Sequence, residues 1–90
     1  MKILHYSTQF KKDFKKYRNQ PKKLEKLLDV LIILENGEEL PVELKAHKLS
    51  GQYKDCMECH IEGDFLLIWF DESNNIIELL RLGSHSELFK

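Results

Sequence analysis

Residues Tyr53–Phe70, with the sequence YKDCMECHIEGDFLLIWF, carry the clearest structural pattern in this chain. It predicts two strands joined by a tight turn at Glu62-Gly63, since glycine adopts positive φ without steric cost. The second strand, residues 65–70, is six apolar residues in a row, which is typical of a central strand buried on both faces. If the turn has only those two residues, His60 lies directly opposite Phe65, within contact distance across the pair.

The segments on either side of this hairpin predict a strand, two helices, a long loop and a last strand. Phe10, Phe14 and Tyr17 recur at helical spacing and indicate one apolar stripe in the core. Pro21 begins the second helix, and Asn36-Gly37 ends it. The expected elements are the strand Lys2–Ser7, the helices Thr8–Arg18 and Pro21–Glu35, the loop Glu38–Gln52, and the strands Tyr53–Glu62, Asp64–Asp71 and Ile76–Ser84.

This order, β-α-α-β-β-β, is that of an α+β fold in which a helical hairpin packs on one face of a small, mainly antiparallel sheet. With 90 residues the chain is long enough for one domain, residues 1–90. No apolar run approaches the roughly 18 residues that span a membrane, and the first twelve residues do not resemble a signal peptide. We therefore expect a cytoplasmic protein with no membrane contact. Cys56 and Cys59 should point to opposite faces of a strand and remain reduced.

Charge is distributed unevenly along the chain, although the net charge is only −1. Residues 8–26 contain eight basic side chains against Asp13 and Glu25, a net charge of +6. Such a segment is either a solvated helix face or a surface that binds phosphates or an acidic partner.

Antiparallel pairing of the last three strands brings the end of the chain back to the central hairpin. His85 must therefore lie near Asp64, and so near His60. Arg81 belongs to the same region if the loop of residues 71–75 gives it the right face of the sheet. His47 lies in the long loop, and its position does not follow from the strand order.

Three chemical interpretations fit these side chains. His47, His60, His85 and Asp64 could form a three-histidine, one-carboxylate metal site, although no local spacing typical of metal ligands is present. Alternatively, histidines supply the acid and the base for RNA cleavage through the 2′-hydroxyl, while Arg81 offsets charge on the phosphorane and an aromatic ring stacks a base. That reaction needs no metal or other cofactor. The third interpretation is a set of surface histidines without a function.

The segments AHKLSGQYKDCMECHIEGDFLLIWF and LLRLGSHSELF resemble the YafQ-like branch of the RelE/ParE superfamily of toxins. Three blocks typical of that branch occur here in order, and the resemblance covers the whole chain. It implies a RelE-like fold and a ribosome-dependent mRNA interferase, an endoribonuclease that cuts mRNA in the ribosomal A site. It also implies a cognate antitoxin of the DinJ/RelB type, with operator DNA bound only through that antitoxin.

Carried over position by position, the resemblance implies catalytic roles for His47, His60, Asp64, His85 and Arg81. It implies substrate contacts at the aromatic positions Tyr53, Phe65 and Phe89, and charge alone adds Lys45, Lys48 and Lys54. Contact with ribosomal RNA is expected from the basic segment, through Lys11, Lys12, Lys15, Lys16, Arg18, Lys22 and Lys23.

Two other functions remain open from sequence alone. A ParE-like toxin has the same fold but acts on gyrase without RNA chemistry, and the histidine set argues against it. A remnant that only binds the antitoxin would keep the fold without the activity.

Overall fold

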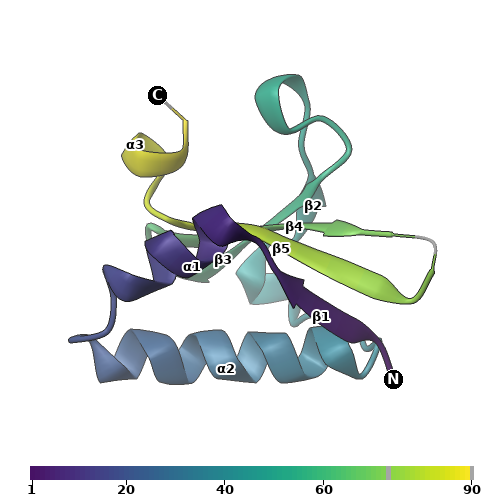
Figure 1. The fold of residues 1–90 in the computed structure, drawn as a ribbon, viewed down its shortest axis with the longest axis horizontal. Coiled ribbons are helices and arrows are strands. Elements are labelled where there is room, and N and C mark those ends of the chain that lie inside the picture. Colours follow the sequence, from purple (N-terminus) through teal and green to yellow (C-terminus); the bar gives the residue numbers. More distant parts are fainter. Residues whose placement is uncertain (73, 90) are drawn as a thin grey trace.

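The computed structural model describes residues 1–72 and 74–89. Its α+β architecture has five strands in the order β1-β5-β4-β3-β2, with β1 parallel to β5 and the other pairs antiparallel (Figure 1). The elements are β1 (Ile3–Tyr6), α1 (Thr8–Lys15), α2 (Pro21–Glu35), the 3-10 turn η1 (Val42–Leu44), β2 (His47–Lys48), the 3-10 turn η2 (Gly51–Tyr53), β3 (Met57–Glu62), β4 (Phe65–Asp71), β5 (Ile76–Gly83) and α3 (His85–Leu88).

The predicted β-α-α-β-β-β order is confirmed, and the structure adds two short elements to it. The expected loop Glu38–Gln52 contains β2, which pairs antiparallel with β3. The expected strand Tyr53–Glu62 begins only at Met57, because the preceding residues form η2 and a turn. The helix α3 follows β5 and was not predicted.

The helix α1 begins where predicted but ends at Lys15 rather than Arg18. Ser7 caps it, since its side-chain oxygen accepts a hydrogen bond from the Phe10 N–H at 3.0 Å. Phe10 is buried as expected, whereas Phe14 is 39% exposed, so the predicted apolar stripe of this helix is only partly core. The helix α2 has the predicted bounds, and Pro21 stands in its first turn.

The sheet has apolar side chains packed on both of its faces. One face packs against α1 and α2, and this core includes Phe10, Leu27 and Leu67. The other face lies under α3 and η2, on the opposite side of the sheet from α2, and includes Leu66 and Leu88 (Figure 1). Because β4 contributes to both clusters, the prediction of a central strand buried on both faces is confirmed.

Cys56 and Cys59 are both buried and free, and they belong to the clusters on opposite faces of the sheet, as their spacing predicted. Among the residues that the structure describes, no helix is long and apolar enough to cross a membrane.

A bulge near the turn of the β3–β4 hairpin changes the predicted register. Glu62 pairs with Phe65 and His60 pairs with Leu66, with the irregularity between His60 and Glu62. The prediction that His60 faces Phe65 is therefore wrong. The turn residues are Gly63 and Asp64, with Gly63 at a φ of 49°.

A second bulge determines the face of Arg81. Trp69 pairs with Leu79, but the next residue along β4, Ile68, pairs with Arg81, so Leu80 is the extra residue. Without this bulge Arg81 would pair with Leu67 and face the helix-covered core. With it, Arg81 faces the same side as Ile68, which is also the side of His60.

Candidate active site

His85 and Asp64 form the centre of the site, as the strand order predicted. The His85 N–H donates to Asp64 Oδ1 at 2.9 Å, and its ring Nδ1 lies 2.9 Å from the same oxygen. The backbone hydrogen bond from His85, followed by the side-chain one, holds the pKa of Asp64 below its usual value. The ring of His60 lies 5.7 Å from the ring of His85, between centroids. Two imidazoles and an ionised carboxylate thus meet at one end of the sheet.

Glu58 belongs to the same site, although sequence reasoning did not identify it. This residue is only 2% exposed, and its Oε1 lies 3.8 Å from His60 Nε2. Its Oε2 is buried and has no hydrogen-bond partner among the described residues. A buried carboxylate needs a cation or a donor to offset the cost of its burial. The signal was available, because residues two apart on a strand share a face, and Glu58 precedes His60 by two.

His47 reaches the site through β2. His47 pairs with Glu58 in the sheet, and its Nε2 lies 3.4 Å from Glu58 Oε1. Its Nδ1 lies 2.8 Å from the carbonyl oxygen of Lys45, which fixes the orientation of the ring. One carboxylate oxygen of Glu58 therefore lies between two histidines, His47 and His60.

A row of aromatic rings extends from His85 across the site. Phe89 lies 5.7 Å from His85 between ring centroids and 5.6 Å from Tyr53, the latter pair being perpendicular. The Tyr53 hydroxyl donates to the carbonyl oxygen of Leu88 at 3.3 Å. Since Phe89 is 37% exposed, part of its ring is free to contact a substrate.

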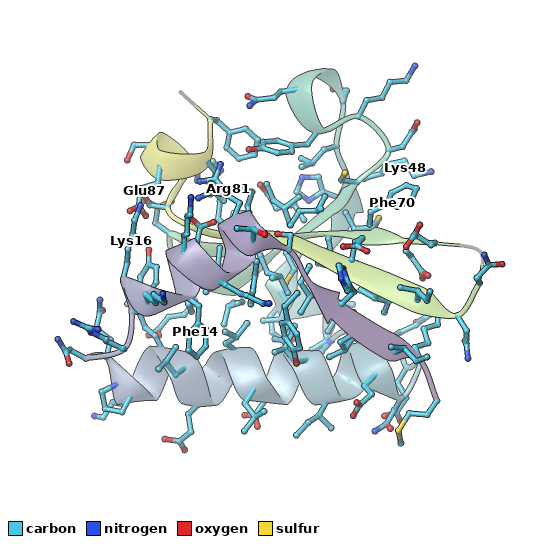
Figure 2. All side chains as sticks on the ribbon, in the orientation of Figure 1. Phe14, Lys16, Lys48, Phe70, Arg81 and Glu87 are labelled. Atoms are coloured by element: carbon cyan, nitrogen blue, oxygen red, sulfur yellow. The ribbon has the colours of Figure 1, made fainter. Side chains whose placement is uncertain are left out.

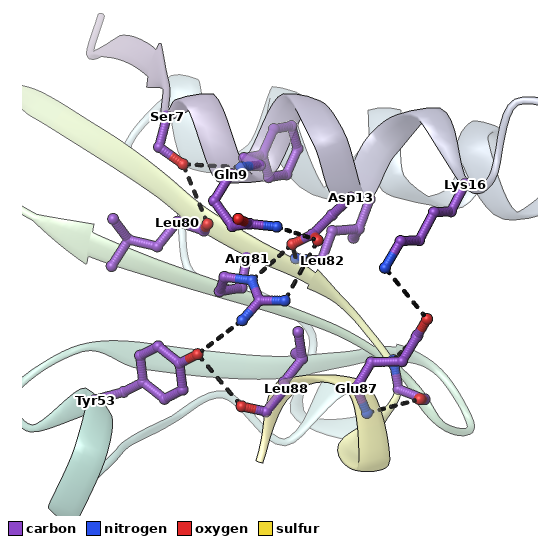
Figure 3. Close-up of polar contacts among 12 residues, drawn as sticks. Ser7, Gln9, Asp13, Lys16, Tyr53, Leu80, Arg81, Leu82, Glu87 and Leu88 are labelled. Atoms are coloured by element: carbon purple, nitrogen blue, oxygen red, sulfur yellow. Dashed lines mark hydrogen bonds and ion pairs between the residues drawn. The ribbon is translucent and has the colours of Figure 1, made fainter. Parts of the chain in front are cut away.

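Arg81 joins this row to the buried Asp13 of α1 (Figure 3). Its Nε donates to Asp13 Oδ2 at 2.8 Å, and its Nη1 donates to the Tyr53 hydroxyl at 3.0 Å. The hydrogen bond to Asp13 is the largest cause that raises the pKa of Arg81. Asp13 also accepts from the backbone N–H of Leu82 at 3.0 Å. Leu82 lies on β5 beyond the residues that pair with β1, so Asp13 supplies the acceptor that no strand provides there.

The sequence matches, over residues 2–90, the family described as the bacterial toxin of type II toxin-antitoxin system, YafQ. The chain belongs to the YafQ toxin family. It is 32% identical to the mRNA interferase toxin YafQ of Escherichia coli K12 over 87 residues, which cover 96% of this chain and 94% of the relative.

Solved structures agree with this assignment. The fold superposes on a metal-bound toxin from Helicobacter pylori with a TM-score of 0.89 and 38% identity, covering 99% of this chain and all of that one. It also superposes on YafQ in the E. coli DinJ-YafQ complex, with a TM-score of 0.86, 31% identity and full coverage of both chains. RelE-like family membership and an α+β fold are thus established together.

In this YafQ-family member, Phe65 does not lie at the site. It is 1% exposed and packs on the helix side of the sheet, with its ring 4.7 Å from that of Tyr17 and the Lys23 ammonium 5.1 Å above it. The expectation that Phe65 stacks a base is wrong for this structure, because the bulge before Glu62 turns it to the opposite face from His60.

The three lysines predicted to contact phosphates are exposed: Lys45, Lys48 and Lys54. His47 pairs with Glu58 and Lys48 with Met57, so Lys48, labelled in Figure 2, lies on the opposite face of the sheet from His47. The predicted ribosome-docking residues are also exposed, apart from the half-buried Lys23; the others are Lys11, Lys12, Lys15, Lys16, Arg18 and Lys22.

The structure also identifies which side chains of this YafQ-family site can hold a metal ion. Glu58, His60 and His85 each offer one ligand atom, and these atoms lie within 4.8 Å of one another. Imidazole nitrogens and a carboxylate oxygen are ligands that zinc and copper accept. This set differs from the predicted one, because it contains Glu58 and lacks both His47 and Asp64. The Asp64 Oδ1 is instead hydrogen-bonded to His85.

Proposed function

We propose that this chain is the toxin of a type II toxin–antitoxin pair and that it cleaves mRNA in the ribosomal A site. The observation that supports the proposal most strongly is the meeting of His60 and His85 with two carboxylates at one end of the sheet. A toxin that only bound gyrase or an antitoxin would need no such set of proton-transfer groups. The relatives named mRNA interferase support the same reaction.

The proposed reaction is attack of the RNA 2′-oxygen on the adjacent phosphorus. A base removes the 2′-hydroxyl proton while the new P–O bond forms, and an acid protonates the departing 5′-oxygen as the P–O5′ bond breaks. The products are a 2′,3′-cyclic phosphate and a 5′-hydroxyl. His85 supplies one of the two proton transfers, oriented by Asp64, and His60 with Glu58 supplies the other.

Arg81 offsets the charge that develops on the phosphate in this proposal. A guanidinium has five N–H groups, and three of them donate to Asp13 and Tyr53. The remaining two are available for phosphate oxygens, and the Arg81 side chain is 20% exposed. Phe89 provides the exposed ring for base stacking, with Tyr53 behind it.

No metal takes part in the proposed reaction, because the side chains provide both proton transfers and the compensating cation. The candidate ligands Glu58, His60 and His85 are then engaged in proton transfer. Cleavage should persist when transition metals are removed by a selective chelator while Mg²⁺ is kept for the ribosome. Loss of cleavage that added zinc or copper restores would contradict metal-free catalysis.

The exposed basic side chains of α1 and the start of α2 are the proposed surface for ribosomal RNA. Lys11, Lys12 and Lys15 lie on α1, and Lys16 is the residue that caps its C-terminal end. Phosphate backbones attract such a surface without sequence preference, and the attraction weakens with salt. A ribosomal target also agrees with the expected cytoplasmic location.

The cognate antitoxin, of the DinJ/RelB type, is the proposed protein partner, and the complex of the E. coli relative with DinJ supports it. We propose that an acidic amphipathic segment of the antitoxin binds an apolar groove between α1 and α2. The groove has a volume of about 610 Å³, and Phe14, labelled in Figure 2, points toward it. Phe14 and Leu28 are exposed in this groove, and Lys11 and Lys15 border it. Because those lysines also belong to the ribosomal surface, the antitoxin and the ribosome would exclude each other.

Induced expression tests the proposed function. We expect the parent chain to arrest growth, and His60→Ala and His85→Ala to abolish arrest at matched soluble levels. Arrest that survives both substitutions would point to a target-binding toxin such as the gyrase type. Absence of arrest from the parent would point to an antitoxin-binding remnant.

A further inference from the structure

The helix that contains His85 is too short to be stable by itself. α3 has four residues, one turn, and a single turn of helix is unfavourable without tertiary contacts. Leu88 anchors one side of it, since this residue is 1% exposed in the cluster with Leu66. The orientation of His85 therefore depends on the polar contacts at the other side of the turn.

Glu87 makes those contacts. Its Oε1 accepts from the Ser84 N–H at 2.9 Å, and the Ser84 hydroxyl in turn accepts from the Glu87 N–H at 3.3 Å, a capping box. The same Oε1 accepts from the Tyr17 hydroxyl at 2.9 Å, and Oε2 lies 3.9 Å from the Lys16 ammonium. Lys16 and Glu87 lie side by side in Figure 2, and their contact is drawn in Figure 3. One carboxylate thus links α3 to the turn that follows α1.

Tyr17 is a rigid anchor for this carboxylate. Its ring packs 4.7 Å from that of the buried Phe65, which fixes the position of the hydroxyl. Burial, together with the hydrogen bond to Glu87, raises the pKa of Tyr17 to about 12. The hydroxyl therefore remains a donor at every pH at which the protein would act.

Gly83 leaves room for the same carboxylate. A Cβ at residue 83 would lie 2.8 Å from Glu87 Oε1, closer than nonbonded atoms approach. The atom concerned is not free to move away, since it accepts hydrogen bonds from both Tyr17 and Ser84. Three separate features of the chain thus converge on the placement of one oxygen.

We propose that Glu87 and Tyr17 are positioning residues for the cleavage reaction: their hydrogen bond docks α3 on the turn that follows α1 and so holds His85 beside Asp64 and His60. Neither side chain touches the reacting atoms. The proposal rests on the proposed function, because it concerns the rate of that reaction. Asp64 holds His85 directly, through hydrogen bonds to its backbone and ring. The Glu87–Tyr17 hydrogen bond instead holds α3, the helix that contains His85.

The test compares Tyr17→Phe, Glu87→Ala and Glu87→Gln with the parent on mRNA in translating ribosomes. Tyr17→Phe keeps the ring on Phe65 and removes only the donor. Glu87→Gln keeps an acceptor oxygen for both hydrogen bonds. The matched control is Glu43→Ala, which removes an exposed carboxylate in η1.

We expect kcat to fall about 10-fold in Tyr17→Phe and up to roughly 100-fold in Glu87→Ala, with KM for the ribosome unchanged, since a misplaced group slows chemistry rather than binding. Glu87→Gln should recover most of the parent rate, and Glu43→Ala should match the parent. Amide hydrogen exchange at Ser84 and His85 should speed up in the two impaired variants, while that of Leu67 in β4 stays slow.

The proposal is overturned if the parent cleaves and Tyr17→Phe and Glu87→Ala cleave at the parent rate. It is also overturned if those variants lose activity only in proportion to lost folded protein, measured by urea unfolding, with His85 exchange unchanged. A parent that does not cleave at all would instead overturn the proposed function, and with it this inference.

Discussion

Asp13 should be the most sensitive polar position in the fold. This residue is 1% exposed and accepts hydrogen bonds from Arg81 Nε at 2.8 Å, from the Leu82 N–H at 3.0 Å and from Gln9 Nε2 at 3.0 Å. The substitution Asp13→Ala removes all of these at once. The Arg81 guanidinium then lacks its carboxylate partner. The N–H of Leu82, a residue that is 1% exposed, lacks an acceptor.

The expected loss in unfolding free energy follows from these contacts. Removing one partner of a buried ion pair costs about 3–5 kcal/mol, and the lower end applies because the Arg81 side chain is 20% exposed and keeps its bond to Tyr53. The unsatisfied Leu82 N–H adds about 1 kcal/mol, for a total of about 4 kcal/mol. Asp13→Asn keeps one acceptor oxygen, and we expect it to cost about 2 kcal/mol.

The assay is urea unfolding at pH 7, with Asp29→Asn on the exposed side of α2 as the control, expected within about 0.5 kcal/mol of the parent. Burial raises the pKa of Asp13, but the hydrogen bonds from Arg81, Leu82 and Gln9 outweigh burial and hold it below its usual value. Its contribution is therefore complete above about pH 4 and is lost as the pH falls through the folded pKa.

The difference in unfolding free energy between the parent and Asp13→Asn should accordingly become smaller toward pH 3. If the unfolding free energy of Asp13→Ala lies within about 0.5 kcal/mol of the parent at pH 7, Asp13 does not stabilise the fold in this way. A gap that widened on acidification would refute the charged state of Asp13.

Three further variants test the ribosomal surface, the position of Phe65 and the groove between α1 and α2. Replacing Lys11, Lys12, Lys15 and Lys16 by Glu should weaken ribosome binding and reduce its salt dependence, whereas replacing them by Arg keeps the charge and should leave binding unchanged. Co-sedimentation with ribosomes across a salt series measures both variants, and equal binding by the two would refute a ribosomal role for α1. Phe65→Leu should lower the unfolding free energy by about 1–2 kcal/mol without changing the cleavage sites, since the ring is buried against Tyr17. Changed cleavage sites with unchanged stability would show that Phe65 contacts the substrate. Leu28→Glu, at a side chain 56% exposed, should leave toxicity intact but prevent neutralisation by the coexpressed antitoxin, and full neutralisation would exclude the groove between α1 and α2.

The parts of the fold that sequence predicted are those with strong local signals. The capped α1, the Pro21 start of α2 and the six apolar residues of β4 each have a pattern with a direct physical cause. The contact between His85 and Asp64 followed from antiparallel pairing alone, without a register.

The parts that sequence missed depend on single extra residues or very short pairings. β2 has two residues, too few to show a pattern, yet it brings His47 to Glu58. The bulge before Glu62 moved Phe65 to the other face, and the bulge at Leu80 turned Arg81 toward the site. A one-residue irregularity inverts every side chain beyond it, and neither bulge is marked by a glycine or a proline.

Mapping the RNA ends made on translating ribosomes shows whether these histidines perform metal-free proton transfer in mRNA cleavage. We expect 2′,3′-cyclic phosphate and 5′-hydroxyl ends with the parent, and cleavage slowed by at least about 100-fold in His85→Ala. Ends with a 5′-phosphate and a 3′-hydroxyl, or parent-rate cleavage by His85→Ala, would contradict it.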